Sequence, residues 1–352
     1  MAEFNFFYAT LIFIPVLFAV ALFFLSRNKK KKKSKAFFFL WNTSLTLLLV
    51  SSLFVGFETY YRFYADYTDS FGLNKMTVRW FARHYKMNNV GMRDNIDYQL
   101  PRSKAKKHRI TFLGDSFTAG QGIKNVDDRF VNIIRKDNPD WDVQCLAVNG
   151  LCSNQELDFL NGISSHGYEF DYVVLCYVLN DMADLLPEQQ AFQQKVYTDY
   201  VDELSYLDTA SYFMNTIHWR IKELTDTDLT NYYSFAKRGY EGPEWNKHKA
   251  TLTQIVNTVQ SKGGKILVVT FPFLNNMGKG TYEFSSVHTQ LDNFWDTSHV
   301  PNLDLLSLYK PYQPDKIMVG KYDAHPNEFA HQLAAKSIED FINRNMAAAT
   351  PN

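Results

Sequence analysis

The sequence predicts an α/β fold: a three-layer α/β/α sandwich with a parallel sheet, preceded by two transmembrane helices. Three observations predict it. Two long apolar runs fill most of the first 60 residues. From residue 109 onward, short β-branched or apolar runs alternate with stretches of helical periodicity, a pattern typical of βαβ units. The strand-like runs are mostly apolar, as expected for parallel strands that are covered on both faces.

Residues 1–60 are predicted to form a transmembrane hairpin. Its apolar runs, at about 4–25 and 36–57, each meet the roughly 20 residues that an α-helix needs to cross a bilayer core. The Lys-rich loop 26–35 between them is expected on the cytoplasmic side by the positive-inside rule. A secretory signal peptide is the alternative, but its charges precede its apolar run, whereas here they follow the first run. The sequence therefore predicts a two-pass protein of the inner or plasma membrane.

The rest of the chain, which this topology places outside the cytoplasm, divides into two parts. Residues 61–108 form a mixed, aromatic, membrane-proximal segment in which FGLNKMTVRWFARHY predicts a short amphipathic helix. No function follows from this segment. Residues 109–346 carry the strand and helix alternation. Within them, 182–245 is rich in Tyr, Gln and charged residues, which predicts a helical insertion. A lid and plain surface elaboration both fit this insertion.

Five strands are predicted for the sheet, each a short and mostly apolar run. They are 109–115, 142–149, 171–179, 265–273 and 302–308. Helical spacing of apolar residues predicts a helix after the first strand, another before the fourth, and a last one that starts near Pro326.

Composition excludes several other classes of protein. Lys plus Arg and Asp plus Glu number 37 each, so the chain as a whole has no electrostatic preference for nucleic acid. The three cysteines lack the spacing of zinc sites or disulfide frameworks, which indicates buried thiols. Neither a GxGxxG nor a Walker-type phosphate loop is present.

Four polar turns follow predicted strands. Ser116 comes directly after the first strand, in GDSFTAGQG, and the others lie in VNGLCSNQE, YVLNDM and YDAHPNEFAH. A serine in such a turn is by itself usually a helix cap. However, the carboxyl ends of parallel strands meet at one edge of a sheet, where ligand sites form. We therefore expect the four turns to converge there.

These stretches resemble, in order, the motif blocks of the SGNH, or GDSL-type, hydrolase family: GDSFTAGQG, NGLCSNQE, VLND and DAHPN. The resemblance covers roughly residues 85–345 and begins with NNVGMRDNIDY, a stretch like those ahead of the first block in membrane-linked members. The first and last blocks are specific, and the two middle ones are weaker. The resemblance implies a flavodoxin-like SGNH sandwich with the activity of a carboxylic ester hydrolase or an O-acyltransferase.

The resemblance also implies the roles of the site residues. It assigns the nucleophile to Ser116, the general base to His325 and the orienting carboxylate to Asp323, while Asp115 is structural. This assignment makes chemical sense, because a serine hydroxyl is a poor nucleophile until an imidazole takes its proton. A carboxylate then holds that imidazole in the useful tautomer.

The oxyanion hole needs donors aimed at the charge that develops on the carbonyl oxygen. The family supplies two backbone N–H groups and an asparagine side chain, and Ser116 and Asn180 match the first and last of these. The second backbone donor is Gly150 by residue type. In members with a GxxG turn the donor is the second glycine, and Ser153 occupies that position in this sequence. Both remain open at this point.

Three functions fit the sequence. The leading one is a membrane-anchored, extracytoplasmic serine esterase or deacylase that acts on an acyl or acetyl ester of a glycan, lipid or related envelope substrate. The first alternative is an O-acyltransferase step in polysaccharide or lipid modification, with a multi-pass membrane acyltransferase as partner. The second is a non-catalytic glycan-binding or assembly protein. No cofactor, metal or nucleic acid is expected, because serine chemistry explains Asp323 and His325 better than a metal site shared with His331.

Overall fold

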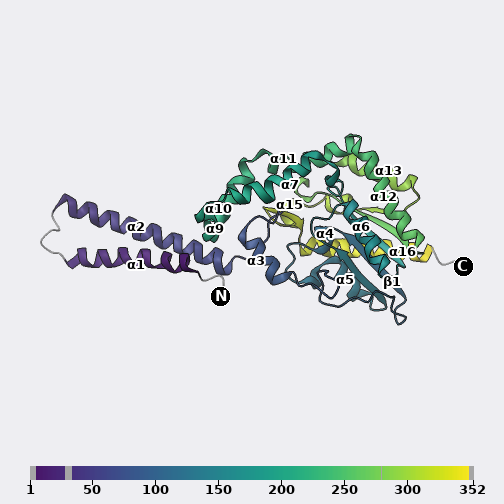
Figure 1. The fold of residues 1–352 in the computed structure, drawn as a ribbon, viewed down its shortest axis with the longest axis horizontal. Coiled ribbons are helices and arrows are strands. Elements are labelled where there is room, and N and C mark those ends of the chain that lie inside the picture. The colour runs from purple at the N-terminus through teal and green to yellow at the C-terminus, as the bar shows by residue number, and fades with distance from the viewer. Residues whose placement is uncertain (1–4, 28–33, 279, 349–352) are drawn as a thin grey trace.

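The computed structural model describes residues 5–27, 34–278 and 280–348. Figure 1 shows two antiparallel N-terminal helices that project from one side of an α/β domain, with the C-terminus on the opposite side. They are α1 (Phe6–Arg27) and α2 (Lys35–Thr59), and α2 continues into a π-helical turn, η2 (Tyr60–Tyr64). Most of the predicted Lys-rich loop 26–35 lies outside the described residues.

Both N-terminal helices are long and apolar enough to cross a membrane. α1 has 22 residues, and α2 together with η2 has 30. Most of their apolar side chains are exposed, for example Phe39 at 71% and Leu53 at 62%. The protein itself therefore does not cover these helices, and an apolar helix surface of this extent needs an apolar surrounding.

A five-stranded parallel sheet forms the centre of the α/β domain, which confirms the predicted sandwich. The strand order is β2-β1-β3-β4-β5, and every neighbouring pair is parallel. The strands are β1 (His108–Gly114), β2 (Trp141–Ala147), β3 (Tyr172–Val178), β4 (Lys265–Phe271) and β5 (Asn302–Asp304). The chain leaves β1 toward β2 on one side and later returns to β3 on the other, which creates a crevice beyond the carboxyl ends of β1 and β3.

Helices cover both faces of this sheet. α5 (Phe130–Asp137) packs against α16 (Glu328–Ala348), and α6 (Ser153–Ser165) packs against α12 (Glu244–Ser261). Right-handed crossovers put α5 on one face and α6 with α12 on the other, because the β1-to-β2 connection runs across the sheet in the opposite direction from the next two. The three cysteines are buried and free.

Shorter elements complete the domain. Those outside the insertion are α3 (Lys75–His84), α4 (Ser116–Ala119), η3 (Val126–Asp128), η6 (Leu274–Asn276), α13 (Ser285–Thr297), α14 (Leu306–Tyr309) and α15 (Pro314–Ile317). The segment predicted as an insertion contains η4 (Ala183–Leu185), α7 (Pro187–Gln194), η5 (Lys195–Asp199), α8 (Tyr200–Asp202), α9 (Tyr206–Ala210), α10 (Tyr212–Thr225) and α11 (Thr227–Glu241).

The end of the domain differs from the prediction in two ways, while the last helix starts near Pro326 as predicted. β5 stops at Asp304 instead of continuing to residue 308, because the Asp304 carboxylate accepts a hydrogen bond from the Leu306 N–H at 2.8 Å and the chain turns into α14. An antiparallel pair, β6 (Met318–Gly320) with β7 (Asp323–Pro326), has no alternating apolar pattern and was not expected. The last helix begins at Glu328, after the Asn327 side chain accepts from the Ala330 N–H at 3.0 Å.

A buried ion pair joins the end of α2 to the helical insertion. Arg62 and Glu58 are 2.7 Å apart, and both side chains are buried. The second oxygen of Glu58 accepts from the Ser211 hydroxyl at 2.6 Å and from the Phe213 N–H at 2.9 Å, at the start of α10. A carboxylate at a helix N-terminus satisfies free N–H groups there. The apolar hairpin is therefore held directly against the α/β domain.

Candidate active site

Ser116, His325 and Asp323 form a hydrogen-bonded chain at the carboxyl edge of the sheet. Oγ of Ser116 lies 2.8 Å from Nε2 of His325, and Nδ1 of His325 lies 2.5 Å from Oδ1 of Asp323. Ser116 is the first residue of α4, directly after β1, and the other two residues lie on β7. The three side chains thus have the order in which an imidazole can take the serine proton while a carboxylate holds Nδ1–H.

The histidine and the aspartate of this hydrogen-bonded series are buried, with His325 6% and Asp323 1% exposed. Burial alone lowers the pKa of His325, but the charge of Asp323 and the hydrogen bond between them outweigh it, and the pKa is raised. Burial alone raises the pKa of Asp323, but the charge of His325 and its hydrogen bond lower it. The pair therefore favours an imidazolium beside a carboxylate, which is the charge state that follows proton transfer from a serine.

Asp115 orders the turn that presents Ser116. Its carboxyl accepts a hydrogen bond from the Phe117 N–H at 2.9 Å and caps the N-terminus of α4. Burial raises the pKa of Asp115 to about 6, against the opposing effect of the Phe117 N–H. Gly120, with a φ of 76°, ends α4 after a single turn. The Asp115 carboxyl also accepts from the Ser116 hydroxyl at 3.4 Å, so its contacts fix the turn around Ser116.

A buried arginine from the membrane-proximal segment holds the end of the same turn. The Arg93 guanidinium donates to the carbonyl of Ala119 at 3.1 Å and also to the carbonyl of Gly120. Arg129 in turn donates to the carbonyl of Arg93 at 3.0 Å. The C-terminal end of the turn is therefore tied to the stretch NNVGMRDNIDY.

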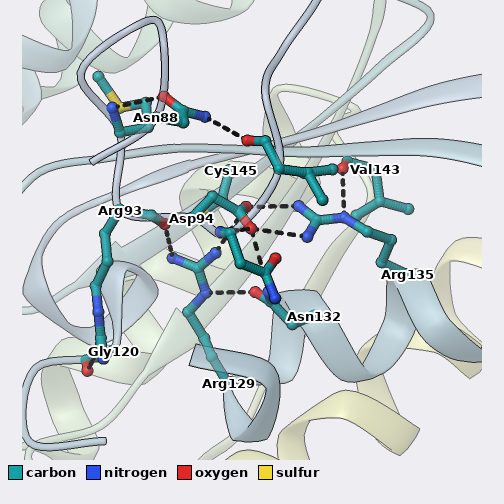
Figure 2. A network of polar contacts seen from close by, with 12 residues as sticks. Asn88, Arg93, Asp94, Gly120, Arg129, Asn132, Arg135, Val143 and Cys145 are labelled. Carbon is teal, nitrogen blue, oxygen red and sulfur yellow. Dashed lines mark hydrogen bonds and ion pairs between the residues drawn. The ribbon is translucent and has the colours of Figure 1, made fainter. Parts of the chain in front are cut away.

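Figure 2 shows Arg129 and Arg135 converging on Asp94, the residue after Arg93. The ion pairs are 3.1 Å and 2.7 Å long, and the Asp94 side chain is fully buried. Burial alone raises the pKa of Asp94, but the Arg135 hydrogen bond and the charges of both arginines lower it to about 2. Asp94 is therefore ionised at neutral pH and compensates two neighbouring cations.

The two candidates for the second oxyanion donor lie in different surroundings. Gly150 lines the same cavity as Ser116 and has a φ of 81°, in a turn closed by a 3.3 Å hydrogen bond from the Leu151 N–H to the Val148 carbonyl. Ser153 is fully buried, and its N–H donates to the carbonyl of Asp181 at 2.8 Å. That N–H is thus already engaged in the fold.

Asn180 also lines the cavity, just beyond the end of β3. The side-chain N–H of Asn180 donates to the hydroxyl of Tyr232 at 3.1 Å. The side-chain oxygen of Asn180, Oδ1, has no hydrogen-bond partner among the described residues. Tyr232 comes from α11 in the insertion. A residue of the insertion therefore fixes the orientation of the Asn180 amide.

The cavity beside Ser116 has a volume of about 340 Å³. Aromatic side chains make up much of its wall: Phe71, Phe192, Tyr197, Tyr232, Tyr233 and Phe273. Amide side chains supply further polar groups: Gln121, Asn149, Gln189 and Gln193. An apolar cavity with a few convergent polar groups and residues with shifted pKa values is typical of a small-molecule binding site.

Sequence reasoning missed the contacts from the membrane-proximal segment. The Thr68 hydroxyl donates to Oδ2 of Asp323, and Oγ of Ser70 accepts from the Ala324 N–H at 2.9 Å. These partners are 255 and 254 residues apart in the chain. A single Thr or Ser in an aromatic stretch has no motif, so no sequence signal pointed to either residue.

His331 lies apart from the hydrogen-bonded series Ser116–His325–Asp323. It is buried, its ring stacks on Phe130 with centroids 5.6 Å apart, and its Nδ1 accepts from the Phe130 N–H at 3.3 Å. Among the described residues, no group of three His, Cys, Asp or Glu side chains is placed to hold a metal ion.

No family model matches the chain, and no curated protein matches it. Solved structures do match. The chain is similar to GDSL-type esterases and acylhydrolases. One of them, a member of the lipolytic G-D-S-L family from Veillonella parvula, has 12% identity over 67% of this chain and 98% of that chain, with a TM-score of 0.40.

Two other solved structures are similar to this chain. A lipase/acylhydrolase from Enterococcus faecalis has 14% identity over 68% of this chain and 96% of its own, with a TM-score of 0.40. A two-domain esterase active on acetylated mannans has 14% identity over 70% of this chain and 52% of its own, with a TM-score of 0.41. At identities and TM-scores this low, the chemistry of the chain has to be inferred from its own residues.

Proposed function

We propose that this chain is a membrane-anchored serine esterase of the SGNH type that removes an acyl group, such as acetyl, from an envelope glycan. The observation that carries the proposal is the hydrogen-bonded order of Ser116, His325 and Asp323, with contacts of 2.8 and 2.5 Å. The nucleophile and the base both line the cavity in which a substrate can bind.

In the proposed reaction, Oγ of Ser116 attacks the acyl carbonyl while Nε2 of His325 takes the hydroxyl proton. The N–H groups of Ser116 and Gly150 and the side-chain amide of Asn180 stabilise the negative charge on the carbonyl oxygen. His325 then gives its proton to the leaving alcohol, and an acyl-enzyme remains. A water molecule that loses its proton to His325 attacks the acyl group and releases the acid, and the proton returns to Ser116.

The lining of the cavity supports a carbohydrate ester as substrate. Flat aromatic side chains suit the apolar faces of sugar rings, and amide side chains suit their hydroxyl groups. The volume of about 340 Å³ lies near the lower end of the range for ligand pockets, roughly 300–1,000 Å³. This size favours a short acyl group over a long fatty acyl chain.

The N-terminal helices support the anchoring part of the proposal. Both are long and apolar enough to span a bilayer, and the Lys-rich segment between them is expected in the cytoplasm. The catalytic domain is then extracytoplasmic, beside the glycans of the envelope. A reporter fused after residue 65 is expected to be extracytoplasmic, and a cytoplasmic reporter would contradict this topology.

A fluorophosphonate probe tests the enzymatic part of the proposal, because it phosphonylates activated serines. Detergent-solubilised wild type is expected to be labelled, Ser116→Ala is not, and Ser261→Ala, a change on the exposed end of α12, is labelled like wild type. A wild type that is folded by circular dichroism yet unlabelled would overturn the proposal in favour of a glycan-binding protein.

The fate of the acyl group is a separate measurement. With an aryl acetate as donor and an oligosaccharide as added acceptor, we expect free acetate in proportion to the phenol released, at every acceptor concentration. Acetylated oligosaccharide that increases with acceptor concentration would instead show that a sugar hydroxyl receives the group, as in an O-acyltransferase.

A further inference from the structure

The segment that connects the hairpin to α3 lies against β7, the strand that carries His325 and Asp323. The Thr68 hydroxyl donates to Oδ2 of Asp323, and both side chains are buried. Two residues on, the Ser70 N–H donates to the Tyr322 carbonyl at 2.9 Å, and Oγ of Ser70 accepts from the Ala324 N–H at 2.9 Å. Residues 322–324 are therefore bonded to residues 68–70 from both sides of Asp323.

The same segment also reaches the oxyanion side of the site. The side-chain N–H of Gln121 donates to the Asp69 carbonyl at 2.9 Å, and the oxygen of that side chain accepts from the Asn149 amide at 2.5 Å. Asn149 precedes Gly150, the backbone donor proposed above. Residues 68–70 thus contact β7 directly and, through Gln121, the turn that contains Asn149 and Gly150.

Asp69 makes this segment rigid. Its buried carboxylate accepts from the N–H groups of Phe71 and Leu73, both at 3.0 Å, from the Asn74 N–H at 3.1 Å, and from the Thr77 hydroxyl at 2.9 Å. A loop closed by its own side chain in this way has little conformational freedom left. Thr68 is consequently held at a fixed position in front of Asp323.

We propose that Thr68 is a positioning residue for Asp323, so that the segment attached to the hairpin completes the active site. Oδ1 of Asp323 is bound by the Nδ1 and the backbone N–H of His325, at 2.5 and 3.1 Å. The Thr68 hydroxyl binds the other oxygen and so fixes the plane of the carboxylate with Oδ1 toward His325. The proposal rests on the function proposed above, because it assigns a task within that reaction.

Charged groups on four elements surround His325 and Asp323, and two uncharged titratable groups lie near them: Tyr233 of α11 within electrostatic reach of Asp323, and His331 of α16 within reach of His325. His325 faces Asp323 on β7, Asp115 at the end of β1 and Asp69 in the connecting segment. Asp323 faces His325, and Glu223 of α10 lies within electrostatic reach of it. Removal of the Thr68 hydroxyl leaves all these charges unchanged and takes one hydrogen-bond donor from Asp323. Asp323 then becomes more basic and holds the His325 proton more strongly.

The test is the rate of fluorophosphonate labelling of the full-length protein in detergent, measured as a function of pH. Thr68→Val is expected to be labelled about ten- to a hundredfold more slowly, the range for a lost hydrogen bond to a charged group. The rise of the rate with pH is expected to shift to higher pH. Thr68→Ser keeps the hydroxyl and is expected to restore both the rate and the profile.

Thr251→Val is the matched control, since Thr251 is also buried and donates a hydrogen bond, to the Asn154 side chain at 2.7 Å, but it lies on α12 where that helix packs against α6. Its labelling should match wild type. Equal rates and pH profiles for Thr68→Val and wild type would overturn the inference, and so would a Thr68→Ser variant as slow as Thr68→Val. Absence of labelling in wild type would instead contradict the proposed function.

Discussion

The hydroxyl oxygen of Ser116 lies 2.8 Å from Nε2 of His325, although 209 residues separate the two in the chain. One residue follows strand β1, and the other lies on the short strand β7 that precedes α16. Because α16 packs against α5, which follows β1 in the chain, the packing of the helices holds the serine and the histidine together. The predictions below test the parts of this arrangement.

Replacing Asp323 by Asn is expected to lower kcat for an aryl acetate by about 10⁴, with little change in KM. An Asn amide keeps the shape of the carboxylate but no longer stabilises the imidazolium, and it permits the wrong tautomer of His325. Asp315→Asn, an exposed aspartate on α15, is the control and should retain the wild-type kcat. A kcat for Asp323→Asn within a few fold of wild type would contradict the triad.

The pH dependence of kcat/KM is expected to show an acid limb with a midpoint above the usual histidine value of 6.5, because the pKa of His325 is raised. Only neutral His325 accepts the serine proton, so the rate rises as pH rises through this pKa. The stability contributed by the His325–Asp323 ion pair has the opposite sign: it is present in full below about 6.5 and is lost as pH rises through the folded pKa. In Asp323→Asn the midpoint should fall, and an unchanged midpoint would show that another group titrates.

Asn180→Ala is expected to lower kcat by about 10²–10³, the usual cost of losing one oxyanion donor. Tyr232→Phe should have a smaller effect of the same kind, because it removes only the hydroxyl that orients the Asn180 amide. Asn293→Ala, on the exposed face of α13, serves as the control. Full activity of Asn180→Ala would remove Asn180 from the oxyanion hole.

Gly150→Ala is expected to lower kcat by about tenfold, because its φ of 81° strains a residue with a Cβ and so displaces the backbone of a turn that lines the cavity. A Cβ at this position meets no atom within 4 Å, so steric overlap would not explain the loss. Ser153→Ala should leave kcat unchanged, since the Ser153 N–H stays bonded to Asp181. Unchanged kinetics in Gly150→Ala would contradict Gly150 as donor.

Asp94→Asn is expected to destabilise the protein by about 3–5 kcal/mol at neutral pH, because Arg129 and Arg135 lose their buried counter-charge. The pKa of Asp94 is lowered to about 2, so its contribution is present above its usual pKa of 3.8 and is lost as pH falls through about 2. Thermal unfolding in detergent should therefore show a wild-type advantage over Asp94→Asn that shrinks on acidification. Asp158→Asn, an exposed change on α6, should behave like wild type at every pH.

Local pattern was enough to predict the sheet, and the resemblance to the SGNH hydrolases pointed to the residues of the site. The strands are buried on both faces, so each one is an apolar run in the sequence. The predicted bounds of the first four strands lie within a few residues of β1 to β4, and the predicted start of the fifth lies at the start of β5. The blocks GDSFTAGQG and DAHPN each carry several fixed residue types at fixed spacing, and they pointed to Ser116, Asp323 and His325. The roles of these residues remain predictions that the experiments above test.

Other parts of the site gave no local signal. Thr68 and Tyr232 are ordinary residues in aromatic stretches, and their contacts with Asp323 and Asn180 depend on segments far away in the chain. The β6–β7 pair was missed for a similar reason, because two strands of three and four residues are too short to show a period of two. Deciding whether Gly150 or Ser153 is the second oxyanion donor requires knowing which of the two backbone N–H groups already has a partner. The type of residue does not specify that partner.

By itself, the sequence determined the α/β class and the two apolar helices, which follow from hydrophobic periodicity over a few residues. Through the resemblance of its motif blocks to those of the SGNH hydrolases, it predicted the serine, the histidine and the aspartate. The tertiary structure decided that residues 68–70 contact β7 directly and the turn at Gly150 through Gln121, and that Tyr232 of α11 orients the Asn180 amide. It also decided that the Ser153 N–H bonds Asp181. Such contacts come from the packing of distant segments, and each depends on the position of whole elements rather than on any local preference of the chain.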